Sequence, residues 1–231
     1  MNIAVILRHM DMKAEGHGLH WNDRFWIGLD YIKMSERFGV GMMAIMNGNN
    51  LDEIASVCDG LIIPGSATNI DPKYYNCTMD DVKLGYDEYK LDAQIMDTFL
   101  RQKKPIFGIC GGHQVMNIFL GGTIKRLDDP QNHCDQETKT HEISIKKGSF
   151  VYDVHGSEKA TVNNYHGWEL GRLSDKLEVV ATTADGVAEA VENKALRLFA
   201  TQYHPELCFH TGNETEAKYF ENFFKICGEC K

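Results

Sequence analysis

The chain has 231 residues and a formal net charge of −9 at pH 7, from 24 basic and 33 acidic side chains. This charge argues against the basic surface that binds nucleic acid or an anionic membrane. Seven cysteines without regular spacing, and a first apolar stretch too short for a signal peptide, predict a reducing, cytoplasmic setting. Because no linker or change of composition divides the sequence, we expect one domain over residues 1–231.

The first half of the chain alternates between strand and helix patterns. Short apolar runs predict strands at 3–7, 40–46, 61–64 and 106–109, and amphipathic periodicity predicts helices at 21–38, 85–100 and 114–120. A pair of glycines at 121–122 ends the last of these helices. Such alternation predicts a three-layer α/β sandwich with a mostly parallel central sheet, whose chemistry lies at the carboxyl ends of its strands.

The second half of the chain is richer in strand patterns. Apolar or alternating runs separated by turn residues predict strands at 142–145, 177–182, 187–191 and 196–203. In the terminal segment 214–227, apolar residues recur on one helical face. We therefore expect these strands to extend the central sheet and the terminal segment to form a helix that packs against the core.

Cys110 follows the predicted strand at 106–109 directly, within the run Gly-Ile-Cys-Gly-Gly-His-Gln at 108–114. Glycines close to Cys110 on both sides permit the sharp strand-to-helix turn that exposes a nucleophile at the edge of a sheet. A cysteine taken alone is more often a buried structural residue. A nucleophilic role for Cys110 therefore requires a base elsewhere in the chain.

His204 and Glu206 supply that base and its orienting carboxylate, because they follow the predicted strand at 196–203 in the run Gln-Tyr-His-Pro-Glu. An imidazole can accept a proton from the thiol near neutral pH and return it to a leaving group. Pro205 keeps the backbone extended, so that Glu206 can reach the far ring nitrogen of His204. Together the three side chains predict nucleophilic catalysis by Cys110.

These segments resemble the nucleophile and base motifs of the class I glutamine amidotransferase superfamily, Gly-x-Cys-x-Gly-x-Gln and His-Pro-Glu. The closer resemblance is to its γ-glutamyl-γ-aminobutyrate hydrolase branch, peptidase C26, through residues 59–75, 114–117, 162–167 and 185–192. The resemblance spans nearly the whole chain. It implies the flavodoxin-like class I glutamine amidotransferase fold and a single catalytic domain over residues 1–231.

The resemblance also implies a reaction, the cleavage of the γ-glutamyl amide bond of a small γ-glutamyl-amine to glutamate and amine through a γ-glutamyl thioester. Cys110 would be the nucleophile, His204 the base and Glu206 its partner. Backbone N–H groups of Gly65 and Gly111 would form the oxyanion hole. The glutamyl end of the substrate would be held by Gln114 and by the backbone around Tyr165, His166 and Gly167.

Two other functions compete with this hydrolase. The string at 108–114 is also close to that of glutaminase subunits, which hand ammonia to a separate synthase. The other competing function is that of a non-catalytic binding module, and the complete Cys-His-Glu set argues against it. The expected partner is a small-molecule γ-glutamyl substrate, with no nucleic acid and no membrane, and a homodimer is compatible with the sequence.

We expect no cofactor and no metal. His133, Cys134 and His141 lie near one another in the sequence, but their spacing fits no usual zinc pattern. Three histidines after the first strand could line a pocket for the leaving group, although a solvated loop is the favoured interpretation: His9, His17 and His20. Suspected substrate contacts in the same region are Arg8, Trp21 and Arg24. Cys227 and Cys230 have the spacing of a redox motif, and we expect an exposed pair without a catalytic role.

Overall fold

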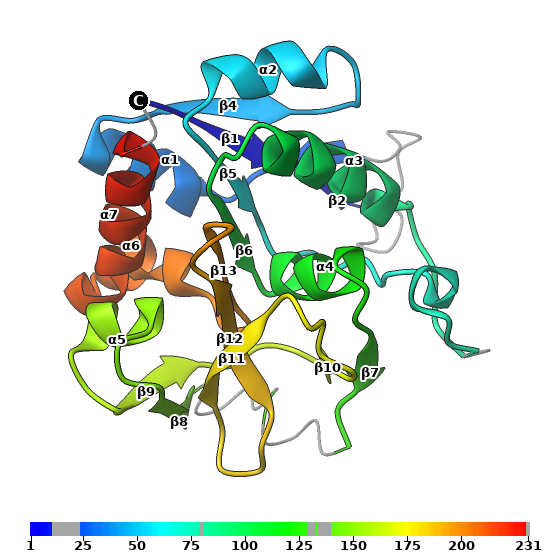
Figure 1. The fold of residues 1–231 in the computed structure, drawn as a ribbon, viewed down its shortest axis with the longest axis vertical. Coiled ribbons are helices and arrows are strands. Elements are labelled where there is room, and N and C mark those ends of the chain that lie inside the picture. The colour runs from blue at the N-terminus through cyan, green and yellow to red at the C-terminus, as the bar shows by residue number, and fades with distance from the viewer. Residues whose placement is uncertain (11–23, 79–80, 129–132, 134–139, 230–231) are drawn as a thin grey trace, which may run out of the picture.

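The computed structural model describes residues 1–10, 24–78, 81–128, 133 and 140–229. One nine-stranded sheet runs through the molecule (Figure 1). In spatial order its strands are β4 (Gly41–Ile45), β1 (Asn2–Ile6), β5 (Gly60–Ile63), β6 (Ile106–Ile109), β13 (Leu198–Thr201), β12 (Ala188–Asn193), β11 (Glu178–Thr182), β8 (Thr140–Ile145) and β9 (Lys159–Asn163). Two short two-stranded sheets pair β2 (Arg8–Met10) with β3 (Arg24–Trp26) and β7 (Ile124–Arg126) with β10 (Trp168–Leu170).

The sheet has a parallel part and an antiparallel extension. Strands β4, β1, β5, β6 and β13 pair in parallel, and β12, β11, β8 and β9 continue the sheet with antiparallel pairings. Parallel strands present their carboxyl ends at one edge, so the segments after β1, β5, β6 and β13 meet there. The predicted α/β fold is confirmed, and the late strands extend the sheet as expected.

Helices cover both faces of the sheet (Figure 1). Residues alternate along β1, with Ile3 and Val5 in one hydrophobic core and Ala4 and Ile6 in the other. The first core is closed by α1 (Leu29–Phe38), α5 (Phe150–His155), α6 (Cys208–Thr211) and α7 (Glu214–Gly228). The second is closed by α2 (Leu51–Val57), α3 (Glu88–Arg101) and α4 (Gly111–Phe119). Two separate cores therefore hold the sheet between layers of helix.

Several elements differ from the sequence prediction. The helix expected at 21–38 begins only at Leu29, because residues 24–26 form β3 and residues 21–23 lie outside the described ones. Helix α4 begins at Gly111, directly after Cys110, and not at residue 114 as predicted. Three short helices, α2, α5 and α6, have too few turns to show a clear apolar period and were not predicted.

Four cysteines of the described residues are free thiols: Cys58, Cys77, Cys110 and Cys208. The expectation that Cys227 is exposed was wrong, because its side chain is fully buried where α7 packs on the sheet. Cys134 and Cys230 lie outside the described residues. Within the described part of the chain, each helix is too short or too polar to cross a bilayer.

Candidate active site

Neighbouring parallel strands deliver the predicted site residues to one edge of the sheet. Cys110 follows β6, Gly65 lies in the loop after β5, and His204 lies just beyond β13. All three line one cleft of about 440 Å³. The residues expected at the glutamyl end of a substrate also line it: Gln114, Tyr165, His166 and Gly167. The structure thus assembles the predicted groups around a single cleft.

Cys110 occupies a strained turn between β6 and α4. Its backbone has φ 51° and ψ −101°, a conformation that a residue with a side chain rarely adopts. The turn is held because the Cys110 N–H donates to the carbonyl of Thr201 at 2.8 Å. Gly112 allows α4 to sit against β5, since a Cβ there would lie 2.1 Å from the Ile63 carbonyl oxygen. Close packing, rather than a positive φ, is therefore what requires glycine beside the cysteine.

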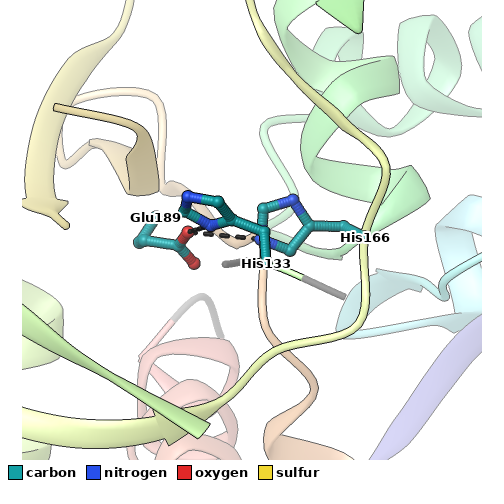
Figure 2. A group of neighbouring side chains, drawn as sticks. All are labelled: His133, His166 and Glu189. Atoms are coloured by element: carbon teal, nitrogen blue, oxygen red, sulfur yellow. Dashed lines mark ion pairs between the residues drawn. The ribbon is translucent and has the colours of Figure 1, made fainter. Parts of the chain in front are cut away.

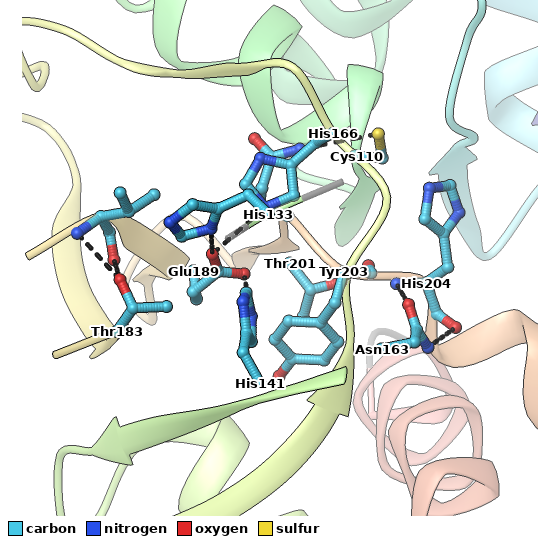
Figure 3. Close-up of polar contacts among 12 residues, drawn as sticks. Cys110, His133, His141, Asn163, His166, Thr183, Glu189, Thr201, Tyr203 and His204 are labelled. Carbon is cyan, nitrogen blue, oxygen red and sulfur yellow. Dashed lines mark hydrogen bonds and ion pairs between the residues drawn. The ribbon is translucent and has the colours of Figure 1, made fainter. Parts of the chain in front are cut away.

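His204 is oriented by a buried carboxylate and by an amide. Its Nδ1 lies 2.7 Å from Glu206 Oε1, and because a carboxylate only accepts, Nδ1–H is the donor. Asn163 fixes the backbone of His204, since its Oδ1 accepts from the His204 N–H and its Nδ2 donates to the His204 carbonyl, each at 2.8 Å (Figure 3). Burial alone would lower the pKa of His204, but the Glu206 carboxylate and the Cys110 thiol raise this pKa well above its ordinary value.

A second carboxyl group, Glu216 on α7, lies buried near Glu206. Burial, and next the charge of Glu206, raise the pKa of Glu216 to about 7. A carboxyl whose pKa is raised on folding favours the folded state only while it is protonated. Its contribution is full below its ordinary pKa and is lost as the pH rises through about 7.

We therefore expect Glu216→Gln to leave the free energy of unfolding almost unchanged near pH 4 and to raise it by roughly 2 kcal/mol at pH 8. Urea denaturation of both proteins at the two pH values measures this difference. The matched control is Glu53→Gln, on the exposed side of α2, which should change stability little at either pH. An equal effect of Glu216→Gln at both pH values would contradict the assignment.

Arg8 anchors the loop that carries Gly65. Its Nε and Nη2 both donate to the Pro64 carbonyl, at 3.1 and 2.6 Å, while Nη1 donates to Asp92 at 2.7 Å. The Pro64 carbonyl and the Gly65 N–H belong to one planar peptide and point in opposite directions. Arg8 therefore sets the direction of the Gly65 N–H and acts as a positioning group. The substrate contact suspected for Arg8 stays a prediction.

The structure also contradicts the favoured interpretation of His9, which placed it in a solvated loop. Its ring is buried and stacks on Tyr86 with centroids 4.9 Å apart, and it meets Phe25 edge-on. It is therefore not part of a solvated loop. The other residues considered with it, His17, His20 and Trp21, lie outside the described part of the chain, while Arg24 is exposed on β3.

Gln202, which no sequence motif singled out, links the nucleophile to Gln114. Its Nε2 donates to Cys110 Sγ at 3.6 Å, and its Oε1 accepts from Gln114 Nε2 at 3.2 Å. His113 Nδ1 lies 3.2 Å from the same oxygen. Gln202 and Asn163 each stand in a segment that the sequence did single out. Their positioning contacts, however, join residues too distant in the chain for a motif to reveal.

Comparisons with known proteins give a family, named relatives and a solved structure of the same fold. Residues 3–206 match the family Peptidase C26, a range that contains Cys110, His204 and Glu206. A Lactococcus lactis protein named as glutamine amidotransferase-like, YvdE, is 28% identical over 216 residues, which cover 88% of this chain and 89% of YvdE. The γ-glutamyl-γ-aminobutyrate hydrolase PuuD of Escherichia coli K12 is 28% identical over 178 residues, 71% of this chain and 70% of PuuD. A Thermoplasma acidophilum crystal structure, named as that of a GMP synthase component, has the same fold, with a TM-score of 0.70 and 21% identity over 99% of this chain and 94% of that one.

Proposed function

Because the chain belongs to the peptidase C26 family and is a glutamine amidotransferase-like hydrolase, we propose that it cleaves the γ-glutamyl amide bond of a small γ-glutamyl-amine. One observation carries the proposal. Cys110 stands on a strained turn in the same cleft as His204, whose Nδ1 is held by Glu206. This is the arrangement that a cysteine nucleophile and its general base require.

In the first half of the proposed reaction, the Cys110 thiolate attacks the side-chain carbonyl of the γ-glutamyl group while His204 carries the thiol proton. The developing oxyanion accepts hydrogen bonds from the N–H groups of Gly65 and Gly111. Gly111 suits this role because it opens α4, where backbone N–H groups are free and the helix dipole favours negative charge. His204 then protonates the departing amine, and a γ-glutamyl thioester on Cys110 results.

In the second half, a water molecule enters the place of the amine and His204 removes its proton as it attacks the thioester. Glutamate leaves, and the thiol of Cys110 recovers its proton. Glu206 holds His204 in one tautomer throughout, so that Nε2 remains the nitrogen that exchanges protons. Gln114 and the backbone of Tyr165 to Gly167, which line the cleft, hold the glutamyl end.

The test is glutamate release by the isolated protein from a panel of free glutamine, γ-glutamyl-γ-aminobutyrate and other γ-glutamyl amides. γ-Glutamyl-γ-aminobutyrate is included because the relative PuuD is named for its hydrolysis. Fast turnover of one amide over glutamine would support the proposal and name the leaving group. Absence of glutamate release from every amide, with intact folding, would overturn it.

A glutaminase subunit that delivers ammonia to a separate synthase is the second candidate, and the string at 108–114 favours it because it is also close to that branch. The same panel separates the two. A glutaminase subunit would hydrolyse glutamine alone, weakly by itself and faster when a synthase partner is added. A γ-glutamyl-amine hydrolase would need no partner.

The anchoring of the Pro64–Gly65 peptide gives a further prediction. Arg8→Lys keeps the charge beside Asp92 but cannot donate two hydrogen bonds to the Pro64 carbonyl. We expect kcat to fall about 10- to 100-fold, part of what the loss of a whole oxyanion donor causes, with KM little changed. Steady-state kinetics on the best amide measure kcat and KM separately, with the exposed Arg101→Lys as control. An unchanged kcat in a folded Arg8→Lys protein would remove Arg8 from this role.

A further inference from the structure

Three histidines surround a buried carboxylate behind the active-site cleft. Glu189 on β12 is fully inaccessible to solvent, and His133, His141 and His166 approach it from three other segments (Figures 2 and 3). His133 and His166 are also buried, and their ring centroids lie 5.1 Å apart. Such a concentration of ligand-type groups in a dry interior is costly unless something with charge binds them together.

The atoms that face one another in this cluster lack hydrogen-bond partners among the described residues. They are both carboxylate oxygens of Glu189, Nδ1 of His133, Nε2 of His166 and Nε2 of His141, which meet one another only as ion pairs at 3.3 to 3.6 Å. Buried polar atoms without partners are rare in folded proteins. Five such atoms in one place therefore point to a ligand that accepts their lone pairs.

In contrast, the ring nitrogens of His133 and His166 that point away from Glu189 have hydrogen-bond partners. His133 Nε2 lies 3.0 Å from Asp185 Oδ2, and His166 Nδ1 lies 3.0 Å from the carbonyl of Trp168. Both partners are acceptors, so each histidine donates there, and a neutral ring then presents the lone pair of its other nitrogen to Glu189. A carboxylate or carbonyl on the far nitrogen is the arrangement that orients histidines in metal sites.

The distances fit a metal coordination sphere. Four ligands at zinc bond lengths in a tetrahedron lie about 3.3 Å from one another. Around Glu189 Oε1, His166 Nε2 lies at 3.3 Å and His133 Nδ1 at 3.6 Å, and these three ligand atoms all lie within 4.8 Å of one another. His141 Nε2 lies 3.4 Å from Glu189 Oε2, which makes it the nearest fourth ligand.

We propose that His133, His166 and Glu189, with His141, bind a divalent transition-metal ion of the class of Zn²⁺. Imidazole and carboxylate ligands suit zinc and its neighbours in the first transition row rather than magnesium or calcium, which prefer oxygen alone. The ion would fasten the loop that bears Tyr165 and Gly167 to β12, and so would hold one wall of the cleft. The expectation of no metal rested on the sequence spacing of His133, Cys134 and His141 alone, which does not include Glu189.

Metal content and thermal unfolding of the full chain, purified without a polyhistidine tag, test the proposal independently of activity. Mass spectrometry of the metals is expected to find about one equivalent of zinc or a neighbouring divalent ion per chain. Dialysis against a chelator should lower the Tm by roughly 10 °C, and one equivalent of Zn²⁺ should restore it. Added Co²⁺ should give the visible absorption bands of a tetrahedral site.

Substitutions distinguish the residues that bind the metal ion from residues that do not. Glu189→Gln and His166→Asn should retain less than about 0.1 equivalent of metal, while Asp185→Asn should weaken metal affinity about 10- to 100-fold by releasing His133. His210→Asn, an exposed histidine on α6, is the matched control and should keep the full equivalent. If a ligand variant does not fold, the Tm of the chelated wild-type protein, measured with and without Zn²⁺, tests the proposal instead. A folded wild-type chain without metal, unchanged in Tm by Zn²⁺ and colourless with Co²⁺, would show that protons alone balance this cluster and would overturn the proposal.

Discussion

Replacing Cys110 with alanine is expected to lower the rate of γ-glutamyl amide cleavage by at least about 10⁴-fold, because removal of a nucleophile removes the covalent pathway itself. The remaining cleft and oxyanion donors can only hold the substrate near water. Glutamate release from the best amide of the panel measures the loss. Stopped reactions of the wild-type protein should also show a γ-glutamyl adduct by mass spectrometry, which Cys110→Ala should lack.

The control for this substitution is Cys77→Ala, a partly exposed thiol outside the 440 Å³ cleft. It should retain the wild-type rate. Because Cys110 is small and lies at the edge of the sheet, its replacement should leave the fold intact, and relief of backbone strain at φ 51° is not expected from alanine. Appreciable turnover by a folded Cys110→Ala protein would mean that another group performs the attack.

Glu206→Gln should give the second largest effect, a loss in kcat/KM of about 10² to 10⁴-fold. The amide keeps the size of the carboxylate but not its charge, and it can donate to Nδ1 and so favour the wrong tautomer of His204. Glu206 is also a main cause of the raised pKa of His204. Without it, the imidazolium should lose its proton at lower pH, and the alkaline limb of the kcat/KM profile should move toward lower pH.

A pH profile of kcat/KM for both proteins measures this shift. Glu178→Gln, an exposed carboxylate paired with Lys146, is the matched control and should keep the wild-type profile. A large fall in rate with an unmoved alkaline limb would indicate that Glu206 acts only on the orientation of His204. An unchanged rate would exclude Glu206 from the site.

The sequence predicted the parts of the site that are encoded locally. The strand at 106–109 was predicted with its observed bounds, because a short run with three large apolar side chains followed by a glycine-rich turn leaves few alternatives. Glu206 could be placed on His204 because only one residue, a proline, separates them. The extended backbone expected at Pro205 was wrong, since residues 205–207 form a 3-10 helix that brings Glu206 back to His204. The helix expected at 21–38 was predicted to begin too early. Residues 24–26 form β3 instead, because the pairing of β3 with β2 outweighs the local helical periodicity.

The sequence by itself therefore determined the fold class, the turn that carries Cys110 and the contact of His204 with Glu206, since a local run of residues fixes backbone conformation and short-range contact. Only the tertiary structure decided which distant groups meet. Arg8 reaches Pro64 across 56 positions of chain, and Glu189 meets histidines from three other segments. Such contacts follow from the order in which strands join the sheet. That order is set by the packing of the whole chain, and no single motif contains it.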